Sequence, residues 1–539
     1  MGFLHSSSLF PFLLVFIVSF SWPITSSADI YGDFLHCLSS SSISNLVYTQ
    51  MNSSYSSIFE STIHNSRFIT PTSPKPWVIV TPLHVSHVQT TIRCSKKHGL
   101  QLRTRSGGHD FEGVSYISES ESPFVIIDLA NLRSVQVDVE NEVAWVQSGA
   151  IMGELYYEIA QKSRTLAFPG ALCHGVAFGG YISGGGYGLL FRKYGLAADN
   201  VIDAEFIDAN GRILNRKSMG EDLFWAIRGG GGGSFGIVLS WKIKLVHVPE
   251  TVTVFSISKT LEQNATQILH RWQYISYKFP DGMYPSITIS TTNTTTQDGR
   301  NLTVVVTFST MFLGRANELV SLMQNIFPEL GLTSKDCNEM SFVESILALG
   351  LLPNQNLEIL LDRNYRVSFL VATPSFKTKS DYVKKPIPEI GFQGIWSQLF
   401  EPEARGATLN FVAYGGKMDE IPESAVPFPH RKGNLYKISY NIRWREEDNV
   451  NSERYIAWMR RLYSYMKPFV SKSPREAYVN YRDLDIGKNN EDGYTTYAQM
   501  SVWGRKYFKN NFNRLVKIKT KIDPENFFRH QQSISPYFG

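Results

Sequence analysis

Two residues that could form bonds to a ligand, His109 and Cys173, lie in separate glycine-rich stretches. His109 directly follows two glycines in RTRSGGHDFEGVSY, residues 103–116, and Cys173 lies in FPGALCHGVAFGGYISGGGYGLLFRKYG, residues 168–195. The next residue after the histidine, Asp110, can orient its imidazole ring. A thiol on a glycine-rich loop suits covalent attachment or nucleophilic chemistry better than core packing. We therefore expect both side chains to touch a bound ligand.

A third glycine-rich stretch, RGGGGGSFG, occupies residues 228–236. Because glycine loses most entropy on ordering and offers no side chain to pack, residues 168–195 are predicted to form neither helix nor strand. Exposed backbone N–H groups in such loops bind pyrophosphate, so three of them predict a nucleotide cofactor. None matches the Gly-x-Gly-x-x-Gly fingerprint. No Cys-x-x-Cys spacing or Ser/His/Asp order indicates a zinc site or a hydrolase, and we predict no metal.

The elements that position these stretches predict an α+β fold. Short strands are expected at 76–81, 100–105, 124–128, 143–146, 201–207 and 237–246, mixed with helices at 82–98 and 152–162. Composition changes at Val248 and Pro249. Beyond this point, long strands and amphipathic helices predict an antiparallel sheet with helices packed on one face.

The N-terminus indicates entry into the secretory pathway. An apolar run at 9–22 is followed by Ser26, Ser27 and Ala28, which predicts a cleaved signal peptide over 1–28. The run is too short to span a bilayer, and no later segment is apolar for long enough. The net charge of +5 is spread along the chain, so we expect no nucleic-acid partner.

Four cysteines and four glycosylation sequons fit this compartment. We predict a disulfide between Cys37, near the mature N-terminus, and Cys94, on an expected helix, which leaves Cys173 free. Cys337 is either free and buried or paired in a way that the sequence does not show. Asn-x-Ser/Thr sequons, any of which could be unmodified, begin at Asn52, Asn264, Asn293 and Asn301.

Several stretches resemble the berberine bridge enzyme family of plant flavoproteins, whose FAD domain is of the vanillyl-alcohol-oxidase type. The shared stretches are KPWVIVTP, RTRSGGHD, SGGGYG, KYGLAADN, SMGEDLFWAIRGGG, PFPHRKGNLY and NYRDLDIG, and they extend over nearly the whole mature chain. Within the family the chain resembles the cannabinoid synthases and the mulberry-type oxidases and Diels–Alder enzymes. The resemblance implies an arm at 29–71, a PCMH-type FAD-binding domain at 72–248, a substrate domain at 249–475 and a C-terminal segment at 476–539 that returns to the FAD domain.

The resemblance also implies an FAD held by two covalent bonds, from His109 and Cys173. Val176 matches the family position that admits dioxygen, which favours an oxidase over a dehydrogenase. Tyr181 stands where the family usually has histidine, and His174-Gly175 replaces the usual Pro-Thr, so slower flavin reduction is expected. Other residues implied to contact FAD are Arg105, Ser106, Gly107, Gly108, Asp110, Gly179, Gly180, Ser183, Gly186, Gly236 and Ile237.

The catalytic residues that the resemblance implies are Tyr481, Lys437 and Tyr187. A phenol with a free pKa near 10 is a poor base, and a lysine close to Tyr481 would favour the phenolate. Alternatively, Lys437 simply belongs to a half-buried strand. Arg443, where relatives have small or apolar residues, either holds a phenolate or carbonyl oxygen of the substrate or faces solvent.

The sequence therefore predicts a monomeric, vacuolar or apoplastic oxidase. It would act on a phenolic, prenylated small molecule, with dioxygen as acceptor and hydrogen peroxide as product. The alternative is a redox-neutral enzyme that retains FAD and catalyses an intermolecular [4+2] cycloaddition. A third function in the family, carbohydrate oxidation, would require polar pocket strands, and 367–376 and 409–414 read as too apolar for this.

Overall fold

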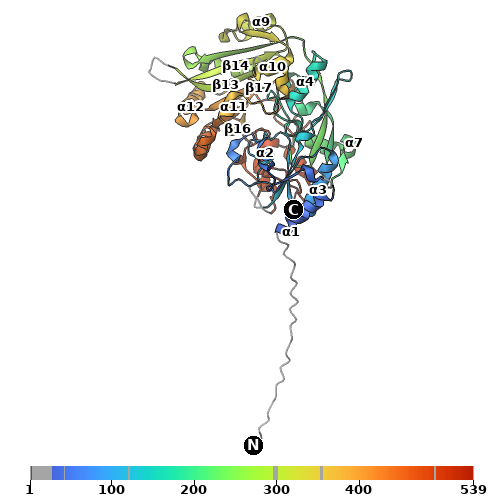
Figure 1. Ribbon diagram of the computed structural model, residues 1–539. Coiled ribbons are helices and arrows are strands. Elements are labelled where there is room, and N and C mark those ends of the chain that lie inside the picture. Colours follow the sequence, from blue (N-terminus) through green and yellow to red (C-terminus); the bar gives the residue numbers. More distant parts are fainter. Residues whose placement is uncertain are drawn as a thin grey trace.

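The computed structural model describes Gly2 and residues 27–41, 43–118, 122–294, 302–352, 356–490 and 493–537 (Figure 1). The predicted signal peptide lies almost entirely outside these ranges, as does Asn301. Asn52, Asn264 and Asn293 are exposed. Within the described ranges, no helix is both long and apolar enough to cross a bilayer.

A small four-stranded sheet carries the first glycine turn. Its strand order is β1 (Val47–Thr49), β2 (Val78–Val80), β4 (Phe124–Asp128) and β3 (Gln101–Arg105), with the last three strands parallel. Strands β2 and β4 are buried throughout, as expected for parallel strands that are covered on both faces. Helix α3 (Val85–Lys97) connects β2 to β3, and β3 delivers the chain into the turn that holds His109.

A five-stranded antiparallel sheet carries the third glycine stretch. Its order is β5 (Val135–Asp138), β6 (Val143–Gln147), β10 (Ile237–Lys244), β8 (Val201–Ile207) and β9 (Ile213–Leu214). Helix α4 (Met152–Lys162) follows β6, and a short ladder joins β7 (Leu166–Ala167) to β11 (Val246–His247). The third glycine stretch lies between α7 (Arg216–Ile227) and β10.

The prediction that residues 168–195 contain no helix is wrong. Helix α5 (Phe178–Ser183) and the single turn α6 (Phe191–Tyr194) lie within this stretch. Phe178 and Ile182 are fully buried, and their burial offsets the entropy that the neighbouring glycines lose. A Cβ atom on Gly179 would lie 3.0 Å from Oγ of Ser106, so glycine permits this helix to approach the first turn closely.

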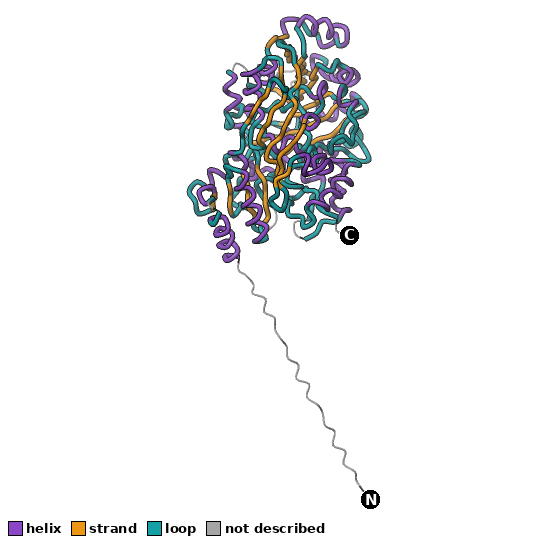
Figure 2. The backbone as a smooth tube through the Cα atoms, turned by 90° about the vertical axis from the view of Figure 1, so that its right-hand side faces the viewer, coloured by secondary structure: helices purple, strands orange, loops and turns teal. Residues whose placement is uncertain are grey.

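The second half of the chain forms one seven-stranded antiparallel sheet, as predicted. Its order is β15 (Cys337–Met340), β12 (Val252–Thr260), β14 (Leu302–Phe312), β13 (Met283–Asn293), β17 (Ala407–Ala413), β18 (Tyr436–Trp444) and β16 (Ser375–Val383). Helices α8 (Ala265–Ile275), α9 (Ala316–Ile326), α12 (Glu389–Leu399) and α14 (Ser452–Tyr465) share a hydrophobic core with one face of this sheet. Figure 2 shows the strands in the interior of the molecule, with helices around them.

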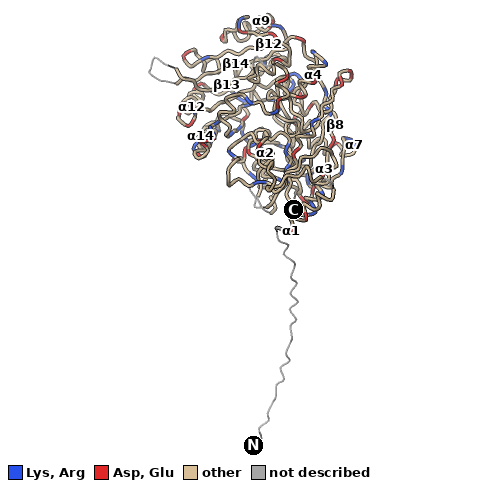
Figure 3. The backbone as a smooth tube through the Cα atoms, viewed as in Figure 1, with Lys and Arg blue, Asp and Glu red and all other residues tan. Residues whose placement is uncertain are grey.

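The C-terminal segment packs on the first half of the chain. Helices α15 (Tyr497–Phe508) and α16 (Asn511–Ile522) bury Trp503, Phe512 and Leu515 in the same core as Phe224 and Trp225 of α7. This path returns residues 478–482 to the glycine-rich stretches. Lysines, arginines and acidic residues are mixed over both parts of the molecule, without a stripe of one sign (Figure 3).

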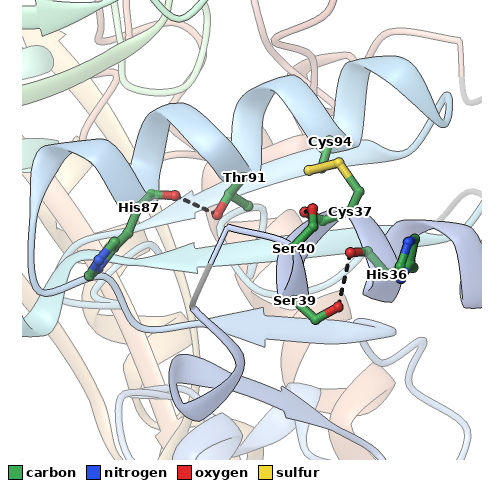
Figure 4. Close-up of a disulfide and its surroundings, with 7 residues drawn as sticks. All are labelled: His36, Cys37, Ser39, Ser40, His87, Thr91 and Cys94. Atoms are coloured by element: carbon green, nitrogen blue, oxygen red, sulfur yellow. Dashed lines mark hydrogen bonds between the residues drawn. A yellow bond between two sulfur atoms is a disulfide. The ribbon is translucent and has the colours of Figure 1, made fainter.

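The predicted disulfide is confirmed. Cys37 on α1 (Ser27–Ser39) is bonded to Cys94 on α3, and the two Cα atoms lie 5.9 Å apart (Figure 4). Cys173 and Cys337 are free, in agreement with the prediction for Cys173.

Candidate active site

One cavity of about 1290 Å³ joins the glycine-rich stretches to the large sheet. Its walls come from residues 102–115, 171–188 and 231–238, from one face of the seven-stranded sheet, from 348–352 and 363–376, and from the C-terminal residues 478–482 and 528–530. A pocket for one small molecule occupies roughly 300–1,000 Å³, so this cavity has room for more than one ligand.

His109 lines this cavity as a neutral imidazole. Its ring stacks on the ring of His64 with centroids 3.6 Å apart, and His64 is held by a 3.1 Å hydrogen bond to the carbonyl oxygen of Gly107. Burial lowers the pKa of His109 to about 3. Its Nε2 atom is buried without a hydrogen-bond partner among the described residues.

Cys173 faces the same cavity from the opposite loop. The loop is attached to the start of α4, because the N–H of Met152 donates to Val176 and the N–H of Gly153 donates to His174, at 2.8 and 2.9 Å. It also approaches the histidine ring, since a Cβ atom on Gly175 would lie 3.6 Å from Nε2 of His109. The thiol of Cys173 is exposed to the cavity, and desolvation by the surrounding protein raises its pKa. The loop that carries the free thiol of Cys173 therefore lies against the buried imidazole of His109.

The structure brings most of the predicted cofactor residues to the cavity wall. Besides His109 and Cys173, they are Ser106, Gly107, Gly108, Asp110, Val176, Gly179, Gly180, Tyr181, Ser183, Gly236 and Ile237. Two predicted residues are not part of the wall. Gly186 is covered by the ring of Tyr181, whose Cε1 would lie 2.6 Å from a Cβ atom there.

Arg105 is the second exception. Its guanidinium is fully buried and donates to Asp128 at 2.6 and 3.0 Å, and to the carbonyl oxygens of Phe59 and Ile58 at 2.7 and 2.8 Å. Arg105 and Asp128 face each other in the register of β3 and β4, so the charge is neutralised inside the protein. The side chain therefore stabilises the base of the turn and does not reach the cavity.

Tyr481 and Tyr187 meet at the cavity wall. Their phenol oxygens are hydrogen-bonded to each other, and Phe111 stacks on Tyr481 with ring centroids 5.4 Å apart. Burial raises the pKa of Tyr481 to about 12, although the hydrogen bond from Tyr187 opposes this shift. Tyr181 in turn donates to the carbonyl oxygen of Tyr187 at 2.9 Å.

Lys437 lies behind this pair and does not line the cavity. Its Nζ atom is 3.4 Å from the ring centroid of Tyr187 and 4.1 Å from that of Tyr481, with no hydrogen-bond partner among the described residues. Burial lowers the pKa of Lys437 well below its ordinary value. Lys437 is thus close to Tyr481, as expected, with its amine over the face of the phenol ring. Burial, however, disfavours both the ammonium and the phenolate in this resting arrangement.

Comparison with known proteins identifies the family. Residues 76–216 match the model of an FAD binding domain, and residues 477–535 match the model described as berberine and berberine like. The chain is 49% identical to berberine bridge enzyme-like 24 of Arabidopsis thaliana over 97% of both chains. It is also 49% identical to tetrahydroberberine oxidase of Berberis wilsoniae, over 95% of this chain and 96% of that protein.

The chain belongs to the berberine bridge enzyme-like family of FAD-linked oxidoreductases. Among solved structures, wild-type Phl p 4.0202, described as a glucose dehydrogenase, is 44% identical, with a TM-score of 0.87 over 94% of this chain and 100% of that chain. A single isoleucine-to-valine variant of Phl p 4 is described as a glucose oxidase. The two-domain α+β fold and the FAD cofactor predicted from the sequence are therefore confirmed.

The cavity of this berberine bridge enzyme-like protein fits FAD. Unpartnered Nε2 of His109 and the cavity-facing thiol of Cys173 are two groups to which a flavin could be attached. Glycines at 231–233 bring the backbone to the cavity wall without side chains in the way. Arg482 lies beside them, with its Nη2 atom 3.7 Å from the position of a Cβ on Gly231.

Sequence reasoning missed the basic side chains of this wall. The cavity-lining arginines that were not predicted are Arg103, Arg363, Arg366, Arg482 and Arg529. They come from four separate places in the chain, because Arg363 and Arg366 are neighbours, and only Arg103 and Arg482 lie inside stretches that had drawn attention. Nothing in their local sequence distinguishes them from surface arginines, so no local signal indicates that they line one cavity.

The wall formed by the large sheet is polar, which corrects one expectation. In β17, Leu409 and Phe411 pack on the helices, whereas Thr408 and Asn410 face the cavity. The other polar side chains on this wall are Ser256, Ser286, Thr288, Thr307, Ser309 and Ser439. The argument that residues 409–414 are too apolar for a carbohydrate pocket was wrong, because alternate residues of a strand face opposite sides.

A second part of the wall is rich in apolar side chains. Residues 367–376 form helix α11 (Ser368–Ala372) and the start of β16, where a pocket strand had been expected. Val367, Phe369 and Leu370 line the cavity there, together with Leu349 and Leu351. The pocket therefore offers hydroxyl and amide groups on one part of its wall and hydrocarbon on another.

Arg443 is partly buried and lines the cavity at the end of β18. Its Nε atom donates to the carbonyl oxygen of Thr373 at 3.0 Å, and its guanidinium lies 4.7 Å from the ring centroid of Phe376. Burial, and secondly the charge of Arg366, lower its pKa to about 10. Arg443 remains a cation at neutral pH.

Proposed function

We propose that this protein is an FAD-dependent oxidase that acts on a small phenolic, prenylated molecule, with dioxygen as acceptor and hydrogen peroxide as product. The observation that carries the proposal is the hydrogen-bonded pair Tyr481–Tyr187 in the same cavity wall as His109 and Cys173. His109 and Cys173 would attach the flavin covalently. Bound FAD would supply the two-electron acceptor.

Tyr481 would accept the proton of a substrate hydroxyl at its phenol oxygen. Tyr187 donates to that oxygen in the phenolate form and so stabilises it, which is the direction in which its hydrogen bond already moves the pKa of Tyr481. A cation at Lys437, 4.1 Å from the ring centroid, would add to this effect when the phenolate forms. Phe111 stacks on the ring of Tyr481 and limits its rotation.

Two features of the cavity support the substrate and the acceptor. The apolar wall with Phe369 and Leu351 suits an isoprenoid chain, and the polar sheet wall suits ring hydroxyls. Val176 lines the cavity next to the Cys173 loop. The relative in which isoleucine was replaced by valine is described as an oxidase, in support of an oxygen-admitting role for valine here.

The test is to mix the purified flavoprotein with candidate prenylated phenols without oxygen and to record the visible flavin absorption. Bleaching that recovers in air with formation of one peroxide per substrate supports the oxidase. If the flavin stays oxidised while a cycloaddition product accumulates, the redox-neutral alternative replaces it. In that case Arg443→Ala should slow product formation by about 100-fold to 1,000-fold, because a buried cation would stabilise charge on a carbonyl oxygen.

The polar sheet wall favours carbohydrate oxidation as a second candidate. Hydroxyl and amide groups such as Ser309, Thr307 and Asn410 are the partners that a sugar requires. Glucose and cello-oligosaccharides in the same anaerobic experiment distinguish the two substrate classes. Bleaching by sugars and none by phenols would replace the phenolic substrate and leave the oxidase intact.

The proposed location is the secretory pathway, with the vacuole or the apoplast as destination. The disulfide between Cys37 and Cys94 and the exposed sequons at Asn52, Asn264 and Asn293 support it. Imaging of a C-terminal fluorescent fusion in plant cells, before and after plasmolysis, separates the two destinations.

A further inference from the structure

The wall of the active-site cavity carries a large excess of positive charge. Among the described residues it contains six arginines, no lysine and a single carboxylate, Asp110. Asp110 is already engaged, because it accepts hydrogen bonds from the N–H groups of Val114 and Ser115 and from the hydroxyl of Ser115. The histidines of the wall add no positive charge at neutral pH, because their pKa values are lowered. They are His64, His109, His174 and His530. A cleft with this charge concentrates anions.

Three of the six arginines lie at the glycine-rich end. Arg103 donates to the carbonyl oxygen of Arg529, and Arg482 donates to the carbonyl oxygen of Gln532 at 3.2 Å. Arg482 approaches the stretch at 231–233, to which His530 is hydrogen-bonded through the carbonyl oxygen of Gly232. The diphosphate of FAD is the anion that this end of the cavity would hold.

A fourth arginine is neutralised within the protein. Arg363 donates to both carboxylate oxygens of Glu154 at 3.1 Å and to the carbonyl oxygen of Gly149 at 2.9 Å. The carboxylate of Glu154 therefore balances the charge of Arg363, without an anionic ligand.

Arg366 and Arg443 remain, and neither has a carboxylate partner among the described residues. Arg443 uses Nε for Thr373 and lies over Phe376, which leaves its two terminal nitrogens for a ligand. Arg366 lines the same cavity without a hydrogen bond or ion pair to any described residue. Arg366 precedes helix α11, and Thr373, the residue that follows this helix, accepts the hydrogen bond from Arg443, so both arginines lie at the same short helix. In agreement, the charge of Arg366 lowers the pKa of Arg443. Two half-buried guanidinium groups repel each other unless an anion lies between them.

Two aromatic rings connect Arg443 to the proposed catalytic tyrosine. Arg443 lies over Phe376, Phe376 meets Phe111 edge-on at 5.3 Å, and Phe111 stacks on Tyr481 at 5.4 Å. A molecule that places an anionic group at the arginines can therefore extend across these rings and present a hydroxyl to Tyr481.

We propose that Arg366 and Arg443 bind a carboxylate group of the substrate, so that the enzyme acts on an aromatic carboxylic acid. The guanidinium group suits a carboxylate because it donates two parallel hydrogen bonds to it. The proposal rests on the proposed function for the position of the substrate, but the arginine pair binds a carboxylate whether or not oxidation follows.

The test is calorimetric titration of the holoenzyme with benzoate and with benzamide. Benzamide is the uncharged molecule of the same shape, so the comparison isolates the negative charge. We expect benzoate to bind at least 10-fold more tightly than benzamide. Arg366→Gln and Arg443→Gln should each weaken benzoate binding by about 10-fold to 100-fold and change benzamide binding less than threefold.

Arg405→Gln is the matched control, because Arg405 is exposed and lies outside the cavity wall. It should leave both affinities within twofold. Flavin absorbance and thermal melting of each variant verify that FAD is bound and that the chain is folded, and Arg443→Lys provides a milder replacement if Arg443→Gln does not fold. Equal binding of benzoate and benzamide, or benzoate affinity unchanged in Arg366→Gln, would overturn the proposal.

The oxidase assay answers a separate question. Arginine-dependent benzoate binding without oxidation of any phenol contradicts the proposed function and leaves the carboxylate site intact. Oxidation of a phenolic carboxylic acid with unchanged KM and kcat in Arg366→Gln contradicts the carboxylate site and leaves the oxidase intact.

Discussion

Tyr187 and Tyr481 are 294 residues apart in the chain, and their phenol oxygens share a hydrogen bond. One tyrosine follows the glycine-rich stretch after α5, and the other belongs to the C-terminal segment. Lys437 of the large sheet lies against both rings. The proposed catalytic group is thus assembled from three distant parts of the chain. The first two predictions concern these three residues.

Tyr481→Phe should reduce kcat/KM by about 100-fold to 10,000-fold, because the phenol oxygen that accepts the proton is removed. Tyr187→Phe should reduce it by about 10-fold, because the hydrogen bond that opposes the raised pKa of Tyr481 is lost. Steady-state kinetics with unchanged flavin absorbance provide the measurement. Tyr365→Phe, a change elsewhere in the cavity wall, serves as control. A Tyr481→Phe enzyme with more than a third of normal activity would exclude Tyr481 as the base.

Lys437→Met should shift the pH dependence of kcat/KM to higher pH. The phenolate of Tyr481 forms as pH rises toward its raised pKa of about 12, so activity should increase with pH below that value. Protonation of Lys437 as the phenolate forms would stabilise the phenolate despite the lowered pKa of the amine. Lys437→Met removes this effect, so the pKa of Tyr481 rises further and the rate falls at each pH, whereas Lys437→Arg retains a positive charge. Rates between pH 7 and pH 10 test this, and superimposable profiles for Lys437→Met and the unaltered enzyme would show that the amine is not charged during turnover.

His109→Ala and Cys173→Ala should each keep FAD covalently bound through the remaining residue, and the double variant should release it on denaturation. The two groups line one cavity from opposite loops, so one bond does not require the other. Flavin fluorescence of the denatured polypeptide and its intact mass provide the measurement. Complete release of FAD from either single variant would contradict attachment at two points.

Arg105→Met should lower the free energy of unfolding by about 3–5 kcal/mol, because the buried carboxylate of Asp128 loses its partner. Arg105→Met combined with Asp128→Leu should recover most of this loss, since no isolated charge remains. Urea unfolding of the FAD-bound protein measures both. If the double variant is as unstable as the single one, the ion pair is not the source of the effect.

Cys37→Ser combined with Cys94→Ser should lower the free energy of unfolding by about 4 kcal/mol. The disulfide closes a loop with a sequence separation of 57 residues, and its loss increases the entropy of the unfolded chain. Cys337→Ser removes a free cysteine and should change the stability by less than about 0.5 kcal/mol. An equal loss in both variants would show that the effect comes from removing thiols and not from the bridge.

Local sequence was sufficient for most of the elements and for picking out two side chains of the cavity wall. Strand β4, helix α3 and the long antiparallel sheet follow from apolar periodicity, and His109 and Cys173 were recognisable from their glycine-rich surroundings. The disulfide between Cys37 and Cys94 also followed from the sequence, because few pairings of four cysteines were reasonable. Local reasoning failed at α5, where glycine is abundant. Burial of the apolar residues of this helix stabilises it by more than the conformational entropy that its glycines lose on ordering.

Only the tertiary structure decided which side chains reach the ligand. Arg105 and Arg103 belong to one strand, yet the first is neutralised by Asp128 and the second lines the cavity. The polar wall and the pair Arg366–Arg443 depend on which strand face meets the cavity and on contacts between distant segments. Charge and hydrogen bonding act through space, so a site built from many parts of a chain is settled by packing and not by sequence order.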